Sequence, residues 1–329
     1  MGAQLRVLRR RIRSVESTKK ITRAQELIAT SRITKAQQRL ESALPYTRTL
    51  VGALEAAAAN ARLDNPLLGS PAEARRSAVL VVTSDRGFAG AYSANVMRQA
   101  EALSGLLREQ GQEVVPYVAG TKGVTWHRFR RREMGGEYTG FSGTPSFADA
   151  RAIADDLLRA ISTPADEGGV DEIHIVYTQF VNMVRQEPRA RRLFPIVVED
   201  APEPLRRIEH GAYADASGVS SSLPSEQGET QISRREDVLP LYEFEPSADG
   251  VLDALLPQYA RILVFSHLLH AAASEHAARR RAMKSATDNA EELQQNLSRA
   301  ANQARQAEIT QEISEIVGGV DALAAAGSE

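Results

Sequence analysis

The sequence contains no cysteine and few aromatic residues. The absence of cysteine excludes disulfide bonds, thiolate zinc sites and a thiol nucleophile, and it fits a reducing compartment. Aromatic residues make up 5% of the chain, so any core or interface must be built mainly from aliphatic side chains and alanine. No run approaches the roughly 18 apolar residues of a membrane span, and the start lacks the apolar region of a secretory signal. The sequence therefore predicts a cytoplasmic protein without a membrane span.

Glycine and proline are scarce near both ends of the chain. No glycine lies between the second residue and Gly52, and Pro257 is the only helix breaker in the long stretch that follows residue 250 and ends near residue 317. Helices over residues 4–59 and 251–325 would be about 80 and 110 Å long. A globular middle of about 150 residues has a radius of gyration near ~15 Å. We therefore expect the ends to protrude as a rod.

Both ends carry apolar residues close to the 3-4 spacing of a coiled coil. In the first stretch these residues are Leu5, Leu8, Ile12 and Val15, continued less regularly by Ile21, Ile28, Ile33, Ala36 and Leu40. In the last stretch they are Leu293, Leu297, Ala300 and Ala304, followed by Ile309, Ile313, Ile316, Val320 and Leu323. An antiparallel pair of the two termini buries both stripes most simply. We predict that residues 1–60 and 250–329 form this antiparallel coiled-coil shaft.

Between the two ends, the pattern changes to strands that alternate with helices. The expected strands are Ala78–Thr83, Glu113–Ala119, Glu172–Tyr177 and Arg192–Val198, and the clear helices are residues 93–109 and 146–161. This order predicts a doubly wound, mainly parallel α/β domain over residues 75–249. Within it, residues 211–237 are rich in Ser, Gly and acidic residues, and we expect them to form a mobile loop. Ser247 or Asp249 is expected to cap the last helix.

Charge is distributed unevenly along the chain, although the net charge is only −2. Residues 1–48 hold twelve Arg and Lys against three Glu, whereas residues 199–253 hold thirteen acidic residues against four Arg. Such asymmetry indicates two different partners or surfaces. Solvated helix surfaces would give the same composition and remain an alternative.

The usual motifs of catalysis and nucleotide binding are missing. The turn Ser84–Ala91 follows a strand, where α/β proteins bind ligands, but it lacks the Gly-x-Gly-x-x-Gly needed to seat a pyrophosphate. A nucleotide-binding enzyme that uses this turn is one alternative, and a tight structural turn is favoured over it. His267 and His270 share a helical face and could hold a metal, but their apolar neighbours favour ordinary packing. Ser142 lies outside a nucleophile elbow. We predict no catalytic residue, cofactor or metal.

The basic first helix raises a further alternative, a coiled-coil scaffold or nucleic-acid-binding protein. Against nucleic-acid binding, Arg9, Arg10 and Arg11 are spread around the helix, and no aromatic residue lies between Met1 and Pro45 to stack on a base. A shaft that meets an acidic protein partner explains the same charges.

Three separated segments make the sequence resemble the gamma subunit of bacterial F-type ATP synthases. They are the run Lys20–Arg32 (KITRAQELIATSR), the turn Ser84–Gly87 with Gly90, and the run Met283–Ala290 (MKSATDNA) followed by Ala304–Ala307 and Ile309–Ile316. Together with the order helix, α/β domain, helix, the resemblance covers nearly the full chain.

The resemblance implies a non-catalytic rotor, the central stalk of a proton-translocating enzyme complex. Its expected partners are the alpha and beta subunits of the catalytic head, the epsilon subunit and the membrane ring of c subunits, with no nucleic acid. The implied place is the cytoplasmic face of the cell membrane, as a peripheral subunit. Proton flow would turn the ring and the shaft, and the asymmetric shaft would force each beta subunit through its binding, synthesis and release states.

The resemblance also implies which residues contact the partners. Arg305 and Gln306 match a polar contact with a beta-subunit loop, and Thr310 and Glu312 lie near the same belt. The basic residues Arg9, Lys19, Lys20 and Arg23 would face an acidic lever segment of the beta subunits. Near the base, Tyr242, Glu243, Phe244 and Glu245 match the region close to the ring and the epsilon subunit. Solvent-facing positions of a coiled coil, or a strand edge near the base, would show the same patterns.

Overall fold

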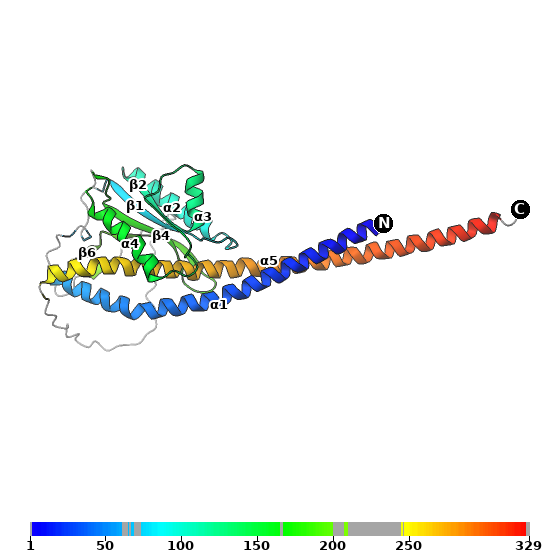
Figure 1. Ribbon diagram of the computed structural model, residues 1–329, viewed down its shortest axis with the longest axis horizontal. Helices are drawn as coiled ribbons and strands as arrows, with labels where there is room; N and C mark the ends of the chain where they lie inside the picture. The colour runs from blue at the N-terminus through cyan, green and yellow to red at the C-terminus, as the bar shows by residue number, and fades with distance from the viewer. Residues whose placement is uncertain are drawn as a thin grey trace. The chain divides into compact units, whose positions relative to one another are not determined.

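The computed structural model describes residues 2–60, 65, 67–68, 74–164, 167–199, 207–209, 245 and 247–326 (Figure 1). Along the chain its elements are α1 (Gly2–Asn60), β1 (Arg76–Val82), α2 (Tyr92–Glu109), β2 (Glu113–Ala119), α3 (Thr121–Phe129), β3 (Gly136–Tyr138), α4 (Phe147–Ser162), β4 (Glu172–Phe180), β5 (Gln186–Phe194), β6 (Val197–Glu199), β7 (Arg207–Glu209) and α5 (Ala248–Ala326). Two long terminal helices flank an alternation of strands and helices, as the sequence predicts.

The chain divides into two compact units. The coiled-coil unit comprises residues 1–30 and 279–329, and the sheet unit comprises residues 31–278. The inner parts of both terminal helices therefore belong to the same compact unit as the sheet.

The sheet unit contains a five-stranded sheet in the order β3-β2-β1-β4-β5. The first four strands are parallel, and β5 is antiparallel to β4 at the edge. A second sheet pairs β6 with β7 in antiparallel fashion. The prediction of a mainly parallel α/β sheet is therefore confirmed.

The central strand β1 is buried on both faces of the sheet. Ala78, Leu80 and Val82 pack in one core with α4 and the inner part of α5, whereas Val79 and Val81 pack in another core with α2. Successive side chains of a strand point to opposite faces, so an uninterrupted apolar run such as this one needs cover on both sides. Figure 1 shows α2 on one side of the sheet and α4 with α5 on the other.

Helix α5 is capped at its first turn and is hydrogen-bonded to α4 and β4 farther along. Ser247 caps it, because its Oγ accepts a hydrogen bond from the Gly250 N–H at 3.1 Å, which confirms one of the two predicted caps. Further along, Arg261 Nε donates to Asp155 Oδ1 of α4 at 2.7 Å. Ser274 Oγ donates to the Thr178 carbonyl of β4 at 3.1 Å.

The predicted strand Arg192–Val198 is wrong in its extent. The structure has two strands in this region, β5 ending at Phe194 and β6 beginning at Val197. Pro195 separates them, because it has no N–H group to donate to a strand ladder.

The sequence patterns missed α3 and β3. Helix α3 is short, and it depends on two glycines. A search for apolar periodicity gives glycine no weight, so it did not detect this helix. A Cβ atom on Gly120, whose φ is +99°, would lie 2.3 Å from the Thr83 carbonyl oxygen, and one on Gly123 would lie 2.7 Å from Val118 Cγ1. These glycines let α3 pack closely over the ends of β1 and β2.

The contact between α5 and the sheet should dominate the stability of the sheet unit. Leu256 of α5 is 0% exposed, so Leu256→Ala leaves a cavity and should lower the free energy of unfolding by about 2–5 kcal/mol. Leu106→Ala is the matched control on α2, where Leu106 is 41% exposed, and should cost less than about 1 kcal/mol. Urea denaturation of the full chain followed by circular dichroism measures both, and equal losses would contradict the assignment of Leu256 to the core.

Candidate functional site: the coiled-coil unit and its exposed helix

Helices α1 and α5 run antiparallel in the coiled-coil unit. Lys19 Nζ lies 3.1 Å from Glu291 Oε1, and Thr287 Oγ1 lies 2.7 Å from Thr22 Oγ1. Residue numbers that face each other therefore add to about 309 or 310. In this register Gly2 faces residues 307 and 308. The predicted antiparallel pairing of the termini is confirmed.

The seam of α1 contains polar residues that the apolar pattern did not predict. It follows a strict 3-4 rhythm through Leu5, Leu8, Ile12, Val15, Lys19, Thr22, Glu26 and Ala29. Thr22 and Glu26 are only 8% and 7% exposed, whereas Ile21 and Ile28, which were predicted to continue the stripe, are 60% and 46% exposed. The prediction that Ile21 and Ile28 lie in the seam is wrong. A search for apolar residues alone departs from the true seam wherever polar residues occupy seam positions.

The seam of α5 has the same rhythm and includes several alanines. It runs through Met283, Thr287, Ala290, Gln294, Leu297, Ala301 and Ala304. Met283, Thr287, Ala290 and Ala301 are at most 8% exposed. Leu293 was predicted to lie in the stripe, but it is 48% exposed and lies off the seam.

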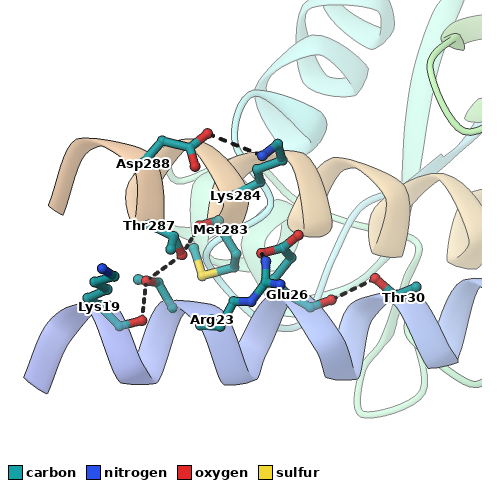
Figure 2. A network of polar contacts seen from close by, with 9 residues as sticks. Lys19, Arg23, Glu26, Thr30, Met283, Lys284, Thr287 and Asp288 are labelled. Carbon is teal, nitrogen blue, oxygen red and sulfur yellow. Dashed lines mark hydrogen bonds and ion pairs between the residues drawn. The ribbon is translucent and has the colours of Figure 1, made fainter. Parts of the chain in front are cut away.

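A hydroxyl pair connects the two helices inside the seam. The Thr22 hydroxyl donates to the Lys19 carbonyl oxygen at 3.1 Å and accepts from the Thr287 hydroxyl. The Thr287 hydroxyl also lies 2.9 Å from the Met283 carbonyl oxygen, and it has one proton for the two acceptors. Figure 2 shows Thr287 and Met283 directed from α5 toward α1.

The predicted basic contact residues lie on α1, and three of them have acidic neighbours. Lys19 pairs with Glu291 across the helices, Lys20 Nζ lies 2.9 Å from Glu16, and Arg23 Nη1 lies 2.8 Å from Glu26. The hydrogen bond and charge of Lys20 lower the pKa of the Glu16 carboxyl. The Lys20 and Arg23 side chains remain 76% and 59% exposed, and exposed pairs of this kind are weak.

The same residues line a shallow groove on the coiled-coil unit. The groove has a volume of about 470 Å³ and is lined by Glu16, Lys19, Lys20, Arg23, Ala24, Leu27 and Gln294. Leu27 is 59% exposed, so the groove offers an apolar contact among three cations and one carboxylate. Arg9, the fourth predicted basic contact, is exposed but does not line the groove.

The four predicted contact residues on α5 are all exposed: Arg305, Gln306, Thr310 and Glu312. The Thr310 backbone carbonyl accepts a hydrogen bond from Ser314 Oγ at 2.9 Å. At about 100° per residue, Arg305 and Glu312 lie on one edge of an apolar stripe, Gln306 lies in line with it and Thr310 lies on the other edge.

That apolar stripe is exposed. Its residues Ile309, Ile313, Ile316, Val317 and Val320 are between 49% and 67% exposed. The expectation that α1 covers it is wrong, because the register brings α1 only as far as residue 308 of α5. The stripe also leaves the 3-4 rhythm of the seam: Glu308 continues that rhythm, and Ile309 begins a new one, turned by more than 100° around the helix. The stripe therefore faces a different side of α5 from the seam with α1.

The predicted contacts near the base lie mostly outside the described residues. Tyr242, Glu243 and Phe244 belong to this group, as do residues 211–237. Glu245 is described and is exposed.

The turn considered as a nucleotide site has the contacts of a structural turn. Asp85 Oδ1 accepts hydrogen bonds from the Thr121 N–H at 3.0 Å and the Thr121 hydroxyl at 2.9 Å, and Oδ2 accepts from the Ser142 N–H at 2.8 Å. Burial alone would raise the pKa of the Asp85 carboxyl, but hydrogen bonds from Ser142, Gly140 and Thr121 together lower it. Asp85 thus ties the start of α3 to the loop before α4.

The two helical histidines have packing roles. His267 Nδ1 lies 2.5 Å from the Leu263 carbonyl oxygen, and its ring packs edge-on against Tyr177 with 4.4 Å between centroids. Burial lowers the pKa of His270 to about 4, with a further contribution from Arg191. Within the described residues, no group of three or more His, Asp or Glu is arranged to hold a metal. No helix in the same part of the chain is long and apolar enough to cross a bilayer.

The comparisons with known proteins agree with one another. A family profile described as ATP synthase matches residues 4–323. The ATP synthase gamma chain of Acidothermus cellulolyticus is 54% identical over 100% of both chains. The chain belongs to the ATP synthase gamma chain family. The gamma chains of Kineococcus radiotolerans and Thermobifida fusca are 53% and 52% identical, covering 99% and 100% of those proteins and all of this chain.

Solved structures share the fold at low identity. The chain matches part of the Euglena gracilis mitochondrial ATP synthase, in a structure of OSCP, F1 and c-ring, with a TM-score of 0.62 and 16% identity over 100% of this chain and 97% of that one. A central stalk and c-ring structure from Tetrahymena thermophila matches with a TM-score of 0.55 and 18% identity, over 81% of this chain and 99% of that one.

Family membership decides between the alternatives left open by the sequence. The chain is a subunit of ATP synthase, an enzyme complex. A free-standing scaffold or a nucleic-acid-binding protein is not favoured.

The contacts of Asp85 predict a pH-dependent contribution to stability. Because the folded pKa is lowered, ionised Asp85 stabilises the fold above the unfolded pKa of about 3.9, and this contribution is lost as the pH falls through the folded pKa. Asp85→Asn should therefore lower the free energy of unfolding by about 1.5–3 kcal/mol at pH 7 and by progressively less below pH 4.

Urea denaturation of the full chain at several pH values between 7 and 3 measures this difference. Glu133→Gln removes an exposed carboxylate from the same unit and serves as the control. A difference between Asp85→Asn and the unaltered chain that stays constant down to pH 3 would show that the carboxylate charge is not what holds the turn.

Proposed function

We propose that the chain transmits rotation through two sets of contacts on the coiled-coil unit, and that it contributes no catalytic group of its own. One set is the basic groove of α1 and the other is the exposed part of α5 around Arg305. Both sets would touch the beta subunits of the catalytic head. The resemblance of the two segments to the family's contact regions, and the exposure of these side chains, support the assignment.

The observation that carries the proposal is the exposed apolar stripe between Ile309 and Val320. Most helical stability in proteins comes from packing of an apolar face against a partner. Contiguous exposed apolar surface marks an interaction site. Since α1 does not reach the stripe, the surface must be supplied by other subunits. A sleeve of alpha and beta subunits around the tip provides it.

The apolar character of the stripe suits a surface that turns. Nonpolar contacts are not directional, so their energy changes little as the helix rotates against the sleeve. The polar residues at its edges act differently, because hydrogen bonds form only at particular angles. Each would contribute about 0.5–1.5 kcal/mol, and more where Arg305 brings a charge. Such contacts define dwell positions and still break on every turn.

Rotation biases the beta subunits because the shaft is asymmetric. A contact favours one conformation of a subunit only when it is stronger in that conformation than in the other. Lys20 and Arg23 lie on one side of α1, where they would attract an acidic lever segment of whichever beta subunit they face. As the shaft turns, a different beta subunit receives this bias.

At the base, Tyr242, Glu243, Phe244 and Glu245 would meet the ring of c subunits and the epsilon subunit. The acidic excess of residues 199–253 supports a surface distinct from that of the basic first helix. In this arrangement the chain is a peripheral subunit at the cytoplasmic face of the cell membrane. Proton flow through the ring then supplies the torque that α5 carries to the head.

The polar belt on α5 is tested by removing its two central side chains. Arg305→Ala combined with Gln306→Ala should reduce coupled ATP synthesis by about tenfold or more, because about 2–4 kcal/mol of charged and neutral hydrogen bonding is lost at a dwell position. Assembly should be preserved, because both residues are exposed and the stripe is intact. Proton-driven ATP synthesis in vesicles that contain the assembled complex measures the effect.

The matched control lies on the opposite side of the same helix. Gln311 Nε2 donates to Glu315 Oε1 at 2.9 Å, and neither side chain borders the stripe. Gln311→Ala with Glu315→Ala should leave synthesis near its normal rate. Equal synthesis by the two double variants would show that the belt around Arg305 makes no rate-determining contact.

The absence of a catalytic group has its own test. Because the contacts of Asp85 are filled by the protein itself, the isolated chain should show neither ATP hydrolysis nor saturable nucleotide binding. Equilibrium dialysis with labelled ATP and a hydrolysis assay on the purified chain measure both. Binding that saturates, and that disappears in Asp85→Ala, would instead support a nucleotide site at this turn.

A further inference from the structure

The end of α3 and the residues that follow it are rich in arginine. Arg128, Arg130, Arg131 and Arg132 lie within one short run, and Phe129 stands among them. Cations near a helix C-terminus interact favourably with the helix dipole, which accounts for one or two of these arginines. Together with Trp126, the run forms a basic aromatic patch on the sheet unit that shares no residue with the contacts proposed for the coiled-coil unit or the base.

Two of the four arginines are held by acidic residues of neighbouring elements. Both terminal nitrogens of Arg132 donate to the Glu101 carboxylate of α2, with Nη2 3.0 Å from Oε2. Arg128 donates to the Glu137 carboxylate of β3. These two pairs tie the patch to the sheet unit and use the charge of the arginines that form them.

The other two arginines keep their charge available. Within the part of the chain that the structure describes, no carboxylate pairs with Arg130 or Arg131. Arg130 stacks on Trp126, with its Cζ 4.2 Å from the ring centroid, and the Cζ of Arg132 lies 5.0 Å from the same centroid. Stacking uses the flat face of a guanidinium and leaves the N–H groups at its edge able to donate to an anion. Trp126 therefore orients Arg130 before any partner binds.

Arg131 has a backbone conformation that favours glycine. Its φ is +53°, in the left-handed region. The Arg131 N–H donates to the Arg128 carbonyl at 3.0 Å, and the Arg132 N–H donates to the His127 carbonyl at 3.1 Å, which together form a Schellman motif. Glycine is the usual residue at the left-handed position of this motif, because a side chain there costs stability. Retention of an arginine at a strained position indicates a role for its side chain.

Phe129 makes little use of its apolar surface within the fold. It is 86% exposed, whereas Val124 and His127 of the same helix are buried. A single exposed apolar residue needs no explanation. Its position beside two available guanidinium groups is more informative, because aromatic residues and arginine are enriched in protein–protein interfaces.

The chemistry of the patch fits carboxylates on a protein better than a lipid surface. A planar guanidinium matches the two oxygens of a carboxylate. An anionic bilayer would meet Glu101, Glu133 and Glu137 as well as the arginines, and one exposed aromatic side chain offers little apolar surface to insert. A peptide segment can instead place its carboxylates at Arg130 and Arg131 alone.

We propose that the basic aromatic patch is a docking surface for an acidic segment of a partner protein in the ATP synthase complex. Carboxylates of that segment pair with Arg130 and Arg131, and an apolar side chain of the segment packs on Phe129. Trp126 is a positioning residue, because it acts through Arg130. The patch adds a contact surface beyond those of the proposed function and does not depend on them.

Photo-cross-linking in the assembled complex tests the proposal. The photoreactive residue p-benzoylphenylalanine replaces Phe129, and mass spectrometry of the digested complex identifies the segment to which it attaches. We expect attachment to a partner-protein segment that carries at least two acidic residues. The same label in place of Val184, which is 78% exposed between β4 and β5, reports chance encounters.

Charge removal tests the pairing. Arg130→Gln with Arg131→Gln should lower the yield of this cross-link about fivefold or more, because charge-assisted hydrogen bonds to the partner are lost. Arg108→Gln with Arg151→Gln removes the same charge from exposed positions elsewhere on the sheet unit and should leave the yield unchanged. Equal yields in the two double variants, or attachment to a segment without acidic residues, would overturn the pairing.

Trp126 and Arg131 provide readouts that a merely structural role would not give. Trp126→Leu removes the stacking and should lower the cross-link yield, and Trp126→Phe should restore most of it. Arg131→Gly relieves the left-handed strain and should raise the midpoint of thermal unfolding of the full chain by about 2 °C while it lowers the yield. Higher stability with an unchanged yield would show that the Arg131 side chain makes no contact with a partner.

The remaining outcomes separate the possible occupants. Attachment of the label to phospholipid would make a bilayer the occupant and overturn the proposal. Attachment only within the chain itself, or no more than the label at Val184 gives, would show that the patch is not an interface. Failure of the Arg305 and Gln306 test alongside a specific cross-link from Phe129 would instead reject the proposed beta-subunit contact on α5 and leave this surface in place.

Discussion

The structure depends on the different ways in which one helix, α5, buries its surface along its length. Between Leu252 and Ala277 the helix is covered on most sides, by the sheet, by α4 and by α1. From Met283 to Ala301 only a narrow seam is buried, and beyond that point the described side chains are mostly exposed. A helix that is apolar all round is stable only inside a core, whereas one with a single apolar stripe needs a single partner. Along its length, α5 is therefore first a buried anchor in the core, then one helix of the coiled coil, and finally a solvent-exposed surface.

The three parts of α5 are held by different kinds of contact. The anchor is held by directional contacts as well as apolar packing, such as the Arg261–Asp155 ion pair and the Ser274 hydroxyl on β4. A helix held only by apolar contacts could rotate about its own axis within its groove, and hydrogen bonds at two separated points oppose this rotation. Under the proposed function, these contacts would pass torque from the sheet unit into α5. The seam farther along uses fewer and weaker contacts, because a slender shaft has little buried surface to offer.

Much of the fold could be predicted from the sequence because its signals are local. Strand β2 was predicted with its observed bounds, and Ser247 marks the start of α5 as a standard N-cap. The errors arose where the deciding contact is distant in sequence or polar. Pro195 divides β5 from β6 because it cannot donate to the strand ladder, and this ladder exists only in the folded sheet. Helix α3 depends on the close approach of Gly120 to Thr83. Ile21 and Ile28 look like seam residues until Thr22 and Glu26 are seen to occupy the seam. The predicted contact residues were taken from the resemblance to the gamma-subunit family, because an exposed contact residue on a helix produces no periodic pattern in the sequence.

The change of phase between Glu308 and Ile309 has a consequence for how the chain tolerates substitution. Seam residues up to Glu308 face α1, and the apolar residues from Ile309 onward face another side of the helix, so the two groups share few neighbours. Substitutions in separate groups are expected to combine additively, because non-additivity requires contact or a common partner. The sequence of this part of α5 can therefore vary while the pairing of the helices stays the same. One continuous helix in this way holds two segments that can diverge independently.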